Sequence, residues 1–152
     1  MRGDYWSNAP VDKSRQIKDV WKSQENTFID LGDDVFTRGR PHPMIDQRLR
    51  NERLLEEAAD PEVAVILLDV VLGYGAHPDP AAEIVPAIRS AQAAARRKGR
   101  QIAFVASVCG TDEDPQGLER QEAALRSAGV LLAGSNARAV RLAAALVARR
   151  GS

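Results

Sequence analysis

A continuous apolar stretch at residues 63–72, VAVILLDVVL, constrains the fold of this chain more than any other feature. Asp69 is its one polar residue, and five of the ten residues are Val or Ile. A run without polar alternation is typical of a strand covered on both faces, as in a parallel sheet. Gly73 and Gly75 follow it, and Asp79-Pro80 then supplies a helix N-cap and a first helical residue. A buried strand, a glycine loop and a helix start form the place where α/β proteins bind ligands.

The segments around this strand predict a doubly wound α/β domain. Short connections between alternating helices and strands favour a mainly parallel sheet with helices on both faces. Pro86, inside one predicted helix, is expected to bend or weaken it. The polar residues 1–26 are expected to form an N-terminal arm before a domain at 27–150. The expected elements are a strand at 27–31, a loop at 36–43, a helix at 44–59, the strand at 63–72, a helix at 81–98, a strand at 102–108, a helix at 118–128, a strand at 130–133 and a helix at 137–150.

Composition and charge limit the class of protein. The chain has 152 residues, long enough for one domain with a real core. Basic and acidic residues number 21 each, so no global field favours nucleic acid or an anionic membrane as a partner. The single cysteine, Cys109, excludes an intrachain disulfide and fits a reducing cytoplasm. No apolar run reaches the roughly 18 residues of a membrane span, and residues 1–8 lack a signal-peptide core, so a cytoplasmic location is expected.

Three loops follow predicted strands and precede helix starts, at 73–79, 109–117 and 134–136. The free N–H groups and the dipole at a helix start favour an anion, which suggests a phosphate or acyl-phosphate site. Ordinary strand-to-helix turns also use glycines and caps, and that alternative stays open. The chain contains neither GxGxxG nor GxxxxGK[ST], the dinucleotide and P-loop patterns. The candidate phosphate contacts are Gly73, Gly75, Gly110, Thr111, Ser135 and Asn136.

The two histidines are candidates for further contacts with a ligand. His77, in the first loop, could donate a hydrogen bond to an anion or take part in transfer chemistry; the alternative is an exposed loop histidine. His42 lies between two prolines, close in sequence to Arg38 and Arg40. These arginines could bind a carboxylate or phosphate, or pair with Asp33-Asp34. The few histidines and the single cysteine lack metal-ligand spacing, so no metal site is expected.

Three longer motifs resemble the FdrA family, whose members are relatives of the succinyl-CoA synthetase α subunit and of NDP-forming acyl-CoA synthetases. The motifs are GRPHPMID at 39–46, GYGAHP at 73–78 and CGT at 109–111, and the similarity covers roughly residues 5–148. The resemblance implies a three-layer, flavodoxin-like ligase domain. In the synthetases this domain carries a phosphorylated histidine, and a preceding Rossmann-type domain binds CoA. Some FdrA-type proteins are associated with an oxamate carbamoyltransferase that uses carbamoyl phosphate, so CoA and a nucleotide or acyl phosphate are the implied cofactors.

The sequence departs from this family pattern in three ways. No part of this sequence is expected to form the CoA-binding domain, and none is expected to form the opening strand and helix of the ligase domain. Residues 109–129, where the synthetases carry the phosphohistidine, contain no histidine. Because His77 lies in a different loop, the phosphohistidine role does not transfer to it.

These observations lead to two functional hypotheses. The first is a ligase-type domain that binds a phosphate, acyl phosphate or carbamoyl phosphate and acts within a larger ligase or carbamoyltransferase assembly rather than alone. The second is a non-catalytic interaction or regulatory module, such as a homodimer. A homo-oligomer is expected, or a partner subunit that supplies the missing CoA-binding and opening ligase elements.

Overall fold

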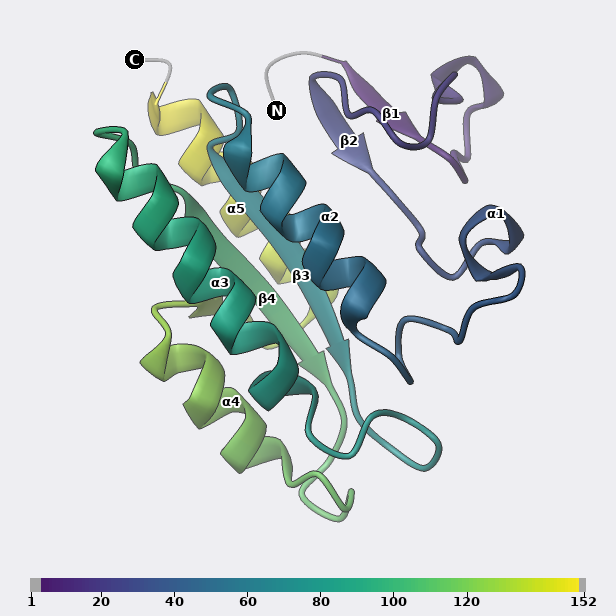
Figure 1. The fold of residues 1–152 in the computed structure, drawn as a ribbon, viewed down its shortest axis with the longest axis vertical. Coiled ribbons are helices and arrows are strands. Elements are labelled where there is room, and N and C mark those ends of the chain that lie inside the picture. Colours follow the sequence, from purple (N-terminus) through teal and green to yellow (C-terminus); the bar gives the residue numbers. More distant parts are fainter. Residues whose placement is uncertain (1–3, 151–152) are drawn as a thin grey trace. The chain divides into compact units, whose positions relative to one another are not determined.

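A computed structural model describes residues 4–150, which fall into two compact units (Figure 1). Unit 1 is Met1–His42 and unit 2 is Pro43–Ser152. The sequence predicted an arm ending at residue 26, whereas this division falls between residues 42 and 43.

Unit 1 is built on a short parallel strand pair. β1 (Tyr5–Ser7) pairs with β2 (Asn26–Phe28), so residues of the predicted arm are bonded to residues that follow it. Asn8 extends the pairing with its side chain. Its Nδ2 donates to the Asp30 carbonyl at 2.9 Å, and its Oδ1 accepts from the Asp30 N–H at 2.8 Å. The Asn8 side chain thus makes the two hydrogen bonds to Asp30 that a neighbouring strand would make. β2 itself ends at Phe28, earlier than the predicted strand at 27–31.

Two short helical turns complete unit 1. The 3₁₀ turn η1 (Lys13–Arg15) is capped by Asp12, and α1 (Asp34–Thr37) is capped by Asp33, which accepts the Val35 N–H. Sequence reasoning missed α1, because a single helical turn is too short to show a 3.6-residue period. Phe36 of α1 is buried, and its ring lies edge-to-face against Trp21 at 4.9 Å between centroids.

Unit 2 alternates helix and strand in the predicted order. Most boundaries differ from the predicted ones by one or two residues. α2 is the exception and begins at residue 48 rather than 44, because the Met44 carbonyl accepts the His77 N–H and Asp46 accepts the Arg48 N–H. The elements are α2 (Arg48–Ala59), β3 (Val65–Val71), α3 (Pro80–Arg97), β4 (Ala103–Cys109), α4 (Leu118–Ser127), β5 (Leu131–Leu132) and α5 (Asn136–Arg150).

The sheet of unit 2 has the strand order β3-β4-β5, and both pairings are parallel. The expectation that residues 27–31 would add a strand to it is wrong, because β2 pairs with β1 in a separate sheet. β3 and β4 are in register over their whole length, from Val65 opposite Ala103 to Val71 opposite Cys109. Their carboxyl ends therefore meet at one edge, where the loops 73–79 and 110–117 begin.

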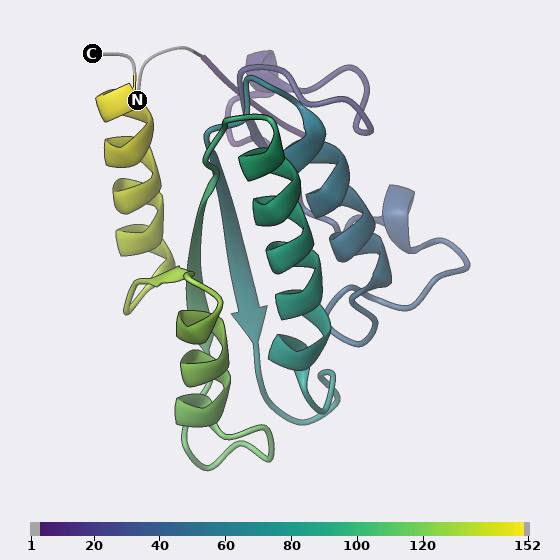
Figure 2. The same cartoon turned by 60° about the vertical axis from the view of Figure 1, so that its left-hand side comes forward.

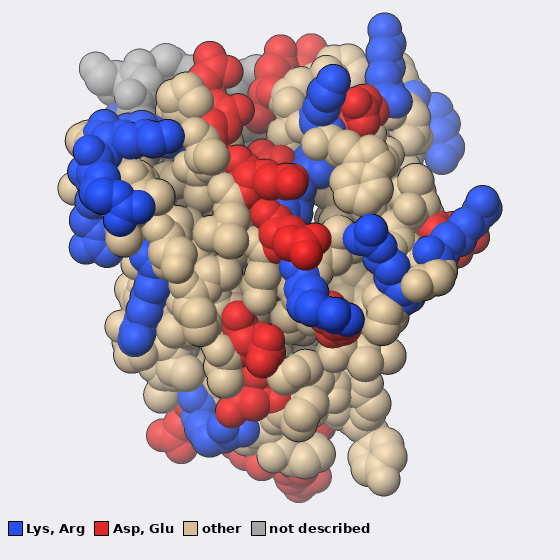
Figure 3. Space-filling model, in the orientation of Figure 1, with Lys and Arg blue, Asp and Glu red and all other residues tan. Residues whose placement is uncertain are grey.

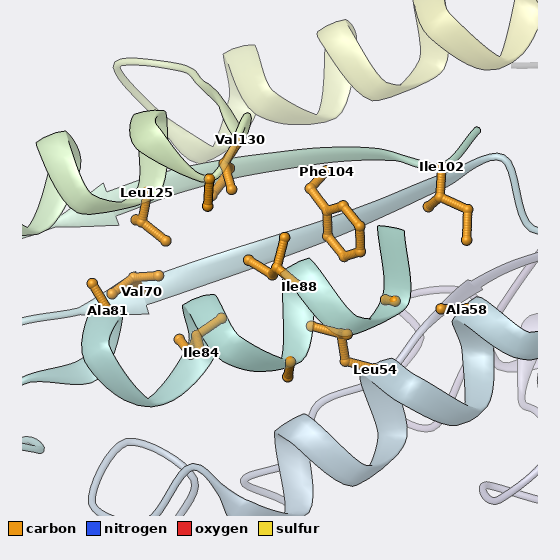
Figure 4. Packing of buried hydrophobic residues seen from close by; sticks show 14 of the residues in the cluster. Leu54, Ala58, Val70, Ala81, Ile84, Ile88, Ile102, Phe104, Leu125 and Val130 are labelled. Carbon is orange, nitrogen blue, oxygen red and sulfur yellow. The ribbon is translucent and has the colours of Figure 1, made fainter. Parts of the chain in front are cut away.

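Helices cover both faces of this sheet, which confirms the predicted three-layer α/β architecture. α2, α3 and α4 share one face and α5 covers the other (Figures 1 and 2). Val70 and Phe104 point from the strands toward α3, where Ile84 and Ile88 meet them (Figure 4). α3 continues through Pro86, so this residue does not end the helix.

Charged side chains of both signs are interspersed on the face seen in Figure 3, in line with the formal net charge of zero. Within residues 4–150, no helix combines the length and the apolar character that a membrane crossing requires.

Shortening Ile88 tests the apolar layer between α3 and the sheet. Ile88 is fully buried, so Ile88→Ala is expected to lower the free energy of unfolding by about 2–5 kcal/mol through lost transfer energy and a residual cavity. Ile45→Ala is the matched control, since Ile45 is 51% exposed, and it should cost less than about 1.5 kcal/mol. Urea unfolding measures both, and equal losses would contradict this core.

Candidate functional site

The candidate site lies where β3 and β4 end side by side. The last rung of their pairing runs from the Leu72 N–H to the Cys109 carbonyl at 2.8 Å. Gly110 follows directly and packs against Leu72, where a Cβ on residue 110 would lie 2.7 Å from the Leu72 Cβ. A side chain at 110 would therefore push the two loops apart.

Gln116 joins the two loops through its buried side-chain amide. Its Oε1 accepts the Gly73 N–H at 3.1 Å, and its Nε2 donates to the Gly73 carbonyl at 3.0 Å. The same Nε2 donates to the His77 carbonyl at 3.2 Å. Three main-chain groups of the loop 73–79 are thus fixed by one residue from the loop 110–117.

A second buried glutamine, Gln121 of α4, fixes the start of α3. Its Oε1 accepts the Ala81 N–H at 2.8 Å, while its Nε2 donates to Asp79 Oδ1 at 3.0 Å. Asp79 is the N-cap of α3 and accepts the Ala82 N–H at 3.2 Å. Arg120 adds an ion pair to the other Asp79 oxygen, with Nη1 to Oδ2 at 2.6 Å.

Two carboxylates at this end of unit 2 titrate below the ordinary range. Partial burial raises the pKa of Asp79, but hydrogen bonds from Gln121, Arg120 and the Ala82 N–H outweigh that effect, and the pKa is lowered. Hydrogen bonds from the Arg48 side chain and backbone lower the pKa of Asp46 to about 2. Both groups are therefore ionised at neutral pH.

The helices that follow the three strands differ in how their first N–H groups are satisfied. In α3, Asp79 and Gln121 accept them, as described above. Before α5, the Ser135 hydroxyl accepts the Arg138 N–H at 3.3 Å. α4 begins after Gly117, which has a positive φ of 69° and provides no side-chain cap. The start of α4 is thus the one of the three that lacks a capping side chain.

The predicted phosphate contacts in the first two loops have these surroundings. The Gly73 N–H is bonded to Gln116, while Gly75 lies in the exposed turn beside Tyr74, whose side chain is fully exposed. The Thr111 N–H and hydroxyl both donate to Asp114 Oδ2, at 2.7 and 3.4 Å. The Asp114 carboxylate thus lies where these donors would meet an external anion.

His77 is held at the junction of three segments. Its N–H donates to the Met44 carbonyl at 2.7 Å, and its ring Nδ1 accepts the Asp79 N–H at 3.1 Å. The contact joins Met44, in the part of the motif 39–46 that belongs to unit 2, to the motif 73–78.

The remaining candidates belong to other segments of the chain than these two loops. Ser135 and Asn136 follow β5, which pairs with β4 on the side away from β3, so they are not part of the two loops that Gln116 joins. Arg38, Arg40 and His42 belong to unit 1 and are exposed. Among the described residues, neither arginine forms an ion pair with Asp33-Asp34.

Sequence reasoning missed Gln116, Gln121 and Arg120. One signal was present for Gln121, because it lies three residues after Leu118 and four before Leu125, inside the apolar stripe of α4. A polar residue in such a stripe is buried and needs partners. Gln116 has no such signal, since its partners are 39 and 43 residues away.

Metal ligands are not grouped in this part of the molecule. Across residues 4–150, no three His, Cys, Asp or Glu side chains lie close enough together to hold a metal ion.

Comparison with known protein families gives the class of this three-layer domain. Residues 10–146 match the CoA-ligase family model, and the chain belongs to this family. It is also similar to a longer protein, "Uncharacterized protein YahF" of Escherichia coli (strain K12), with 49% identity over 134 residues. The match covers 88% of this chain and 26% of YahF, so the chain spans about a quarter of that relative.

Replacing Gln116 tests whether it organises the loop 73–79. Gln116→Met is expected to lower the free energy of unfolding by about 1–3 kcal/mol, because it leaves the Gly73 N–H without its partner. Amide hydrogen exchange at Gly73 should also become faster.

The control for this variant is Gln24→Met, which changes an exposed glutamine that bonds to Thr27 through its main chain. Its expected cost is below about 0.5 kcal/mol. Unchanged exchange at Gly73 in Gln116→Met would show that Gln116 does not hold this loop.

Proposed function

We propose that this chain is a CoA-ligase-type domain of the FdrA kind, which binds a phosphate, acyl phosphate or carbamoyl phosphate and acts within a larger ligase or carbamoyltransferase assembly. Family membership supports the ligase class, and the length of YahF supports action as part of a longer unit. The FdrA assignment rests on the motifs at 39–46, 73–78 and 109–111.

One observation carries this proposal: the loops 73–79 and 110–117 are joined by buried amides into one surface beside the uncapped start of α4. The two glutamines satisfy the structural N–H groups around this point, and the first turn of α4 keeps donors for a ligand. Arg120, whose side chain is more than half exposed, adds a positive charge at the same place. Donors, a helix dipole and a cation are the features that bind phosphate groups.

The predicted contacts fit this surface to different degrees. Gly75 and Gly110 shape the two loops, while Thr111 becomes available if a ligand oxygen replaces Asp114. CoA and a nucleotide are implied by the family resemblance, and we assign no residue of this chain to either.

Ligand-dependent melting tests the proposal directly. Inorganic phosphate, acetyl phosphate, carbamoyl phosphate, CoA and ADP are each titrated against the full chain. A ligand at 100 times its Kd is expected to stabilise the fold by about 2.7 kcal/mol and to raise the Tm accordingly.

Matched arginine variants locate the binding. Arg120→Gln is expected to reduce the shift, whereas Arg97→Gln, at the opposite end of the 18-residue helix α3, should leave it unchanged. The Arg120–Asp79 pair is exposed, so its loss should change the Tm of the free protein little. No shift with any phosphate ligand at millimolar concentration would contradict the proposal.

A second function, an interaction module, is favoured by the edge of β3. Among residues 4–150, β3 has a strand partner on one side only, which is β4. The Ala64 carbonyl accepts the Ala103 N–H, so the main-chain groups of alternate residues, Val65 and Leu67 among them, face away from β4. Arg50 donates to the Asp69 carbonyl on that side at 2.7 Å. An unpaired edge of this kind accepts a strand from another chain.

Light scattering during size-exclusion chromatography tests this second function. If strand pairing joins two copies, the full chain should elute as a dimer. Val65→Pro should weaken that dimer, because it removes an outward N–H while keeping the β3–β4 bonds. A monomer at all concentrations would contradict the homodimer and leave a partner subunit as the occupant.

A further inference from the structure

We propose that His77 binds a ligand oxygen as a hydrogen-bond donor through Nε2, and that it is neither a nucleophile nor a base. This inference rests on the proposed phosphate site and gives its histidine a definite role. Sequence reasoning left two roles open for His77, donation to an anion and participation in transfer. The hydrogen bonds around the ring separate them.

The proton position on the imidazole follows from its inner hydrogen bond. Nδ1 accepts the Asp79 N–H at 3.1 Å, so Nδ1 carries a lone pair and no proton. A neutral imidazole has one protonated nitrogen, which must then be Nε2. Flipping the ring would place a C–H against the same N–H and lose the bond. The structure thus defines the Nε2–H tautomer.

The main chain of His77 keeps the ring in this orientation. Its N–H is bonded to the Met44 carbonyl and its carbonyl accepts from Gln116 Nε2, so the residue is fixed on both sides. Asp79 is itself fixed as the N-cap of α3. No described residue bonds to His77 Nε2, and the side chain is partly exposed. The ring therefore presents one N–H outward.

An outward N–H selects the class of ligand. It can donate to a phosphoryl, acyl-phosphate or carboxylate oxygen, all of which are acceptors. It cannot ligate a metal ion or attack phosphorus, since both require a lone pair at Nε2. Creating that lone pair would move the proton to Nδ1 and break the bond from Asp79. Phosphoryl transfer onto His77 is accordingly not expected.

Nitrogen-15 NMR of the full chain tests the tautomer in the absence of ligand. The chain has two histidines, and the His77→Asn variant identifies the His77 signals by their loss. At about pH 9, where imidazole is neutral, Nε2 should be the protonated nitrogen. An Nδ1–H tautomer would overturn the inference without affecting the proposed phosphate site.

Binding measurements test the donor role. His77→Asn places Oδ1 where Nδ1 was, so it keeps an acceptor for Asp79 and removes the outward donor. Its affinity for inorganic phosphate or acetyl phosphate should fall about tenfold at an unchanged Tm. His77→Gln offers an amide N–H near the former Nε2 position and should recover part of that loss. Equal affinity of His77→Asn and the wild-type chain would overturn the donor role.

Two further experiments ask which kind of oxygen is bound and whether His77 becomes phosphorylated. Acetate in place of phosphate shows whether a carboxylate oxygen is sufficient, and tighter binding of acetate than of acetyl phosphate would overturn the phosphoryl assignment. Mass spectrometry after incubation with acetyl phosphate should find His77 unmodified, and phosphohistidine at this position would overturn the inference. If the wild-type chain binds none of these anions, the proposed function fails together with the ligand assignment, whatever the tautomer.

Discussion

The parallel pairing of β3 with β4 is the constraint on which the rest of unit 2 depends. Because the two strands are in register to their last residues, Leu72 and Gly110 emerge in contact, and two loops must share the space beyond them. The absence of a side chain at 110 permits this approach. Replacing Gly110 with any other residue would displace the loop 110–117 from the loop 73–79, to which it is hydrogen-bonded.

Buried side-chain amides pair the main-chain polar groups that this close approach of two loops removes from water. Two loops pressed together hide main-chain N–H and C=O groups, and each unpaired group costs about 1–3 kcal/mol. Gln116 and Gln121 lie at the start of α4. Gln116 bonds to the loop 73–79, and Gln121 bonds to the start of α3. Since these residues satisfy the structural groups, we propose that the uncapped first turn of α4 and the Nε2 of His77 keep their donors for a ligand.

The chain matches one part of a longer relative. It belongs to the CoA-ligase family, yet it spans about a quarter of YahF. Among the described residues, its main sheet has three strands, and the outer edge of β3 is unpaired. The site loops and the strand edge support different functions, and one chain can serve both if a partner strand completes the sheet beside a working phosphate site. Melting with ligands and light scattering report on these two features separately.

The sequence by itself determined the α/β class and the location of the loops, because the run at 63–72 leaves few alternatives to a doubly covered strand. Helix boundaries followed from local signals such as Asp79-Pro80, which act within one turn. The pairing of β2 with β1 and the role of Asn8 were not predictable, since they join residues about 20 apart in the sequence. Only the tertiary structure decided which donors at the site are occupied, because Gln116 and Gln121 act on partners about 40 residues away. It also placed the Asp79 N–H against Nδ1 of His77, the contact from which we propose the tautomer of this residue.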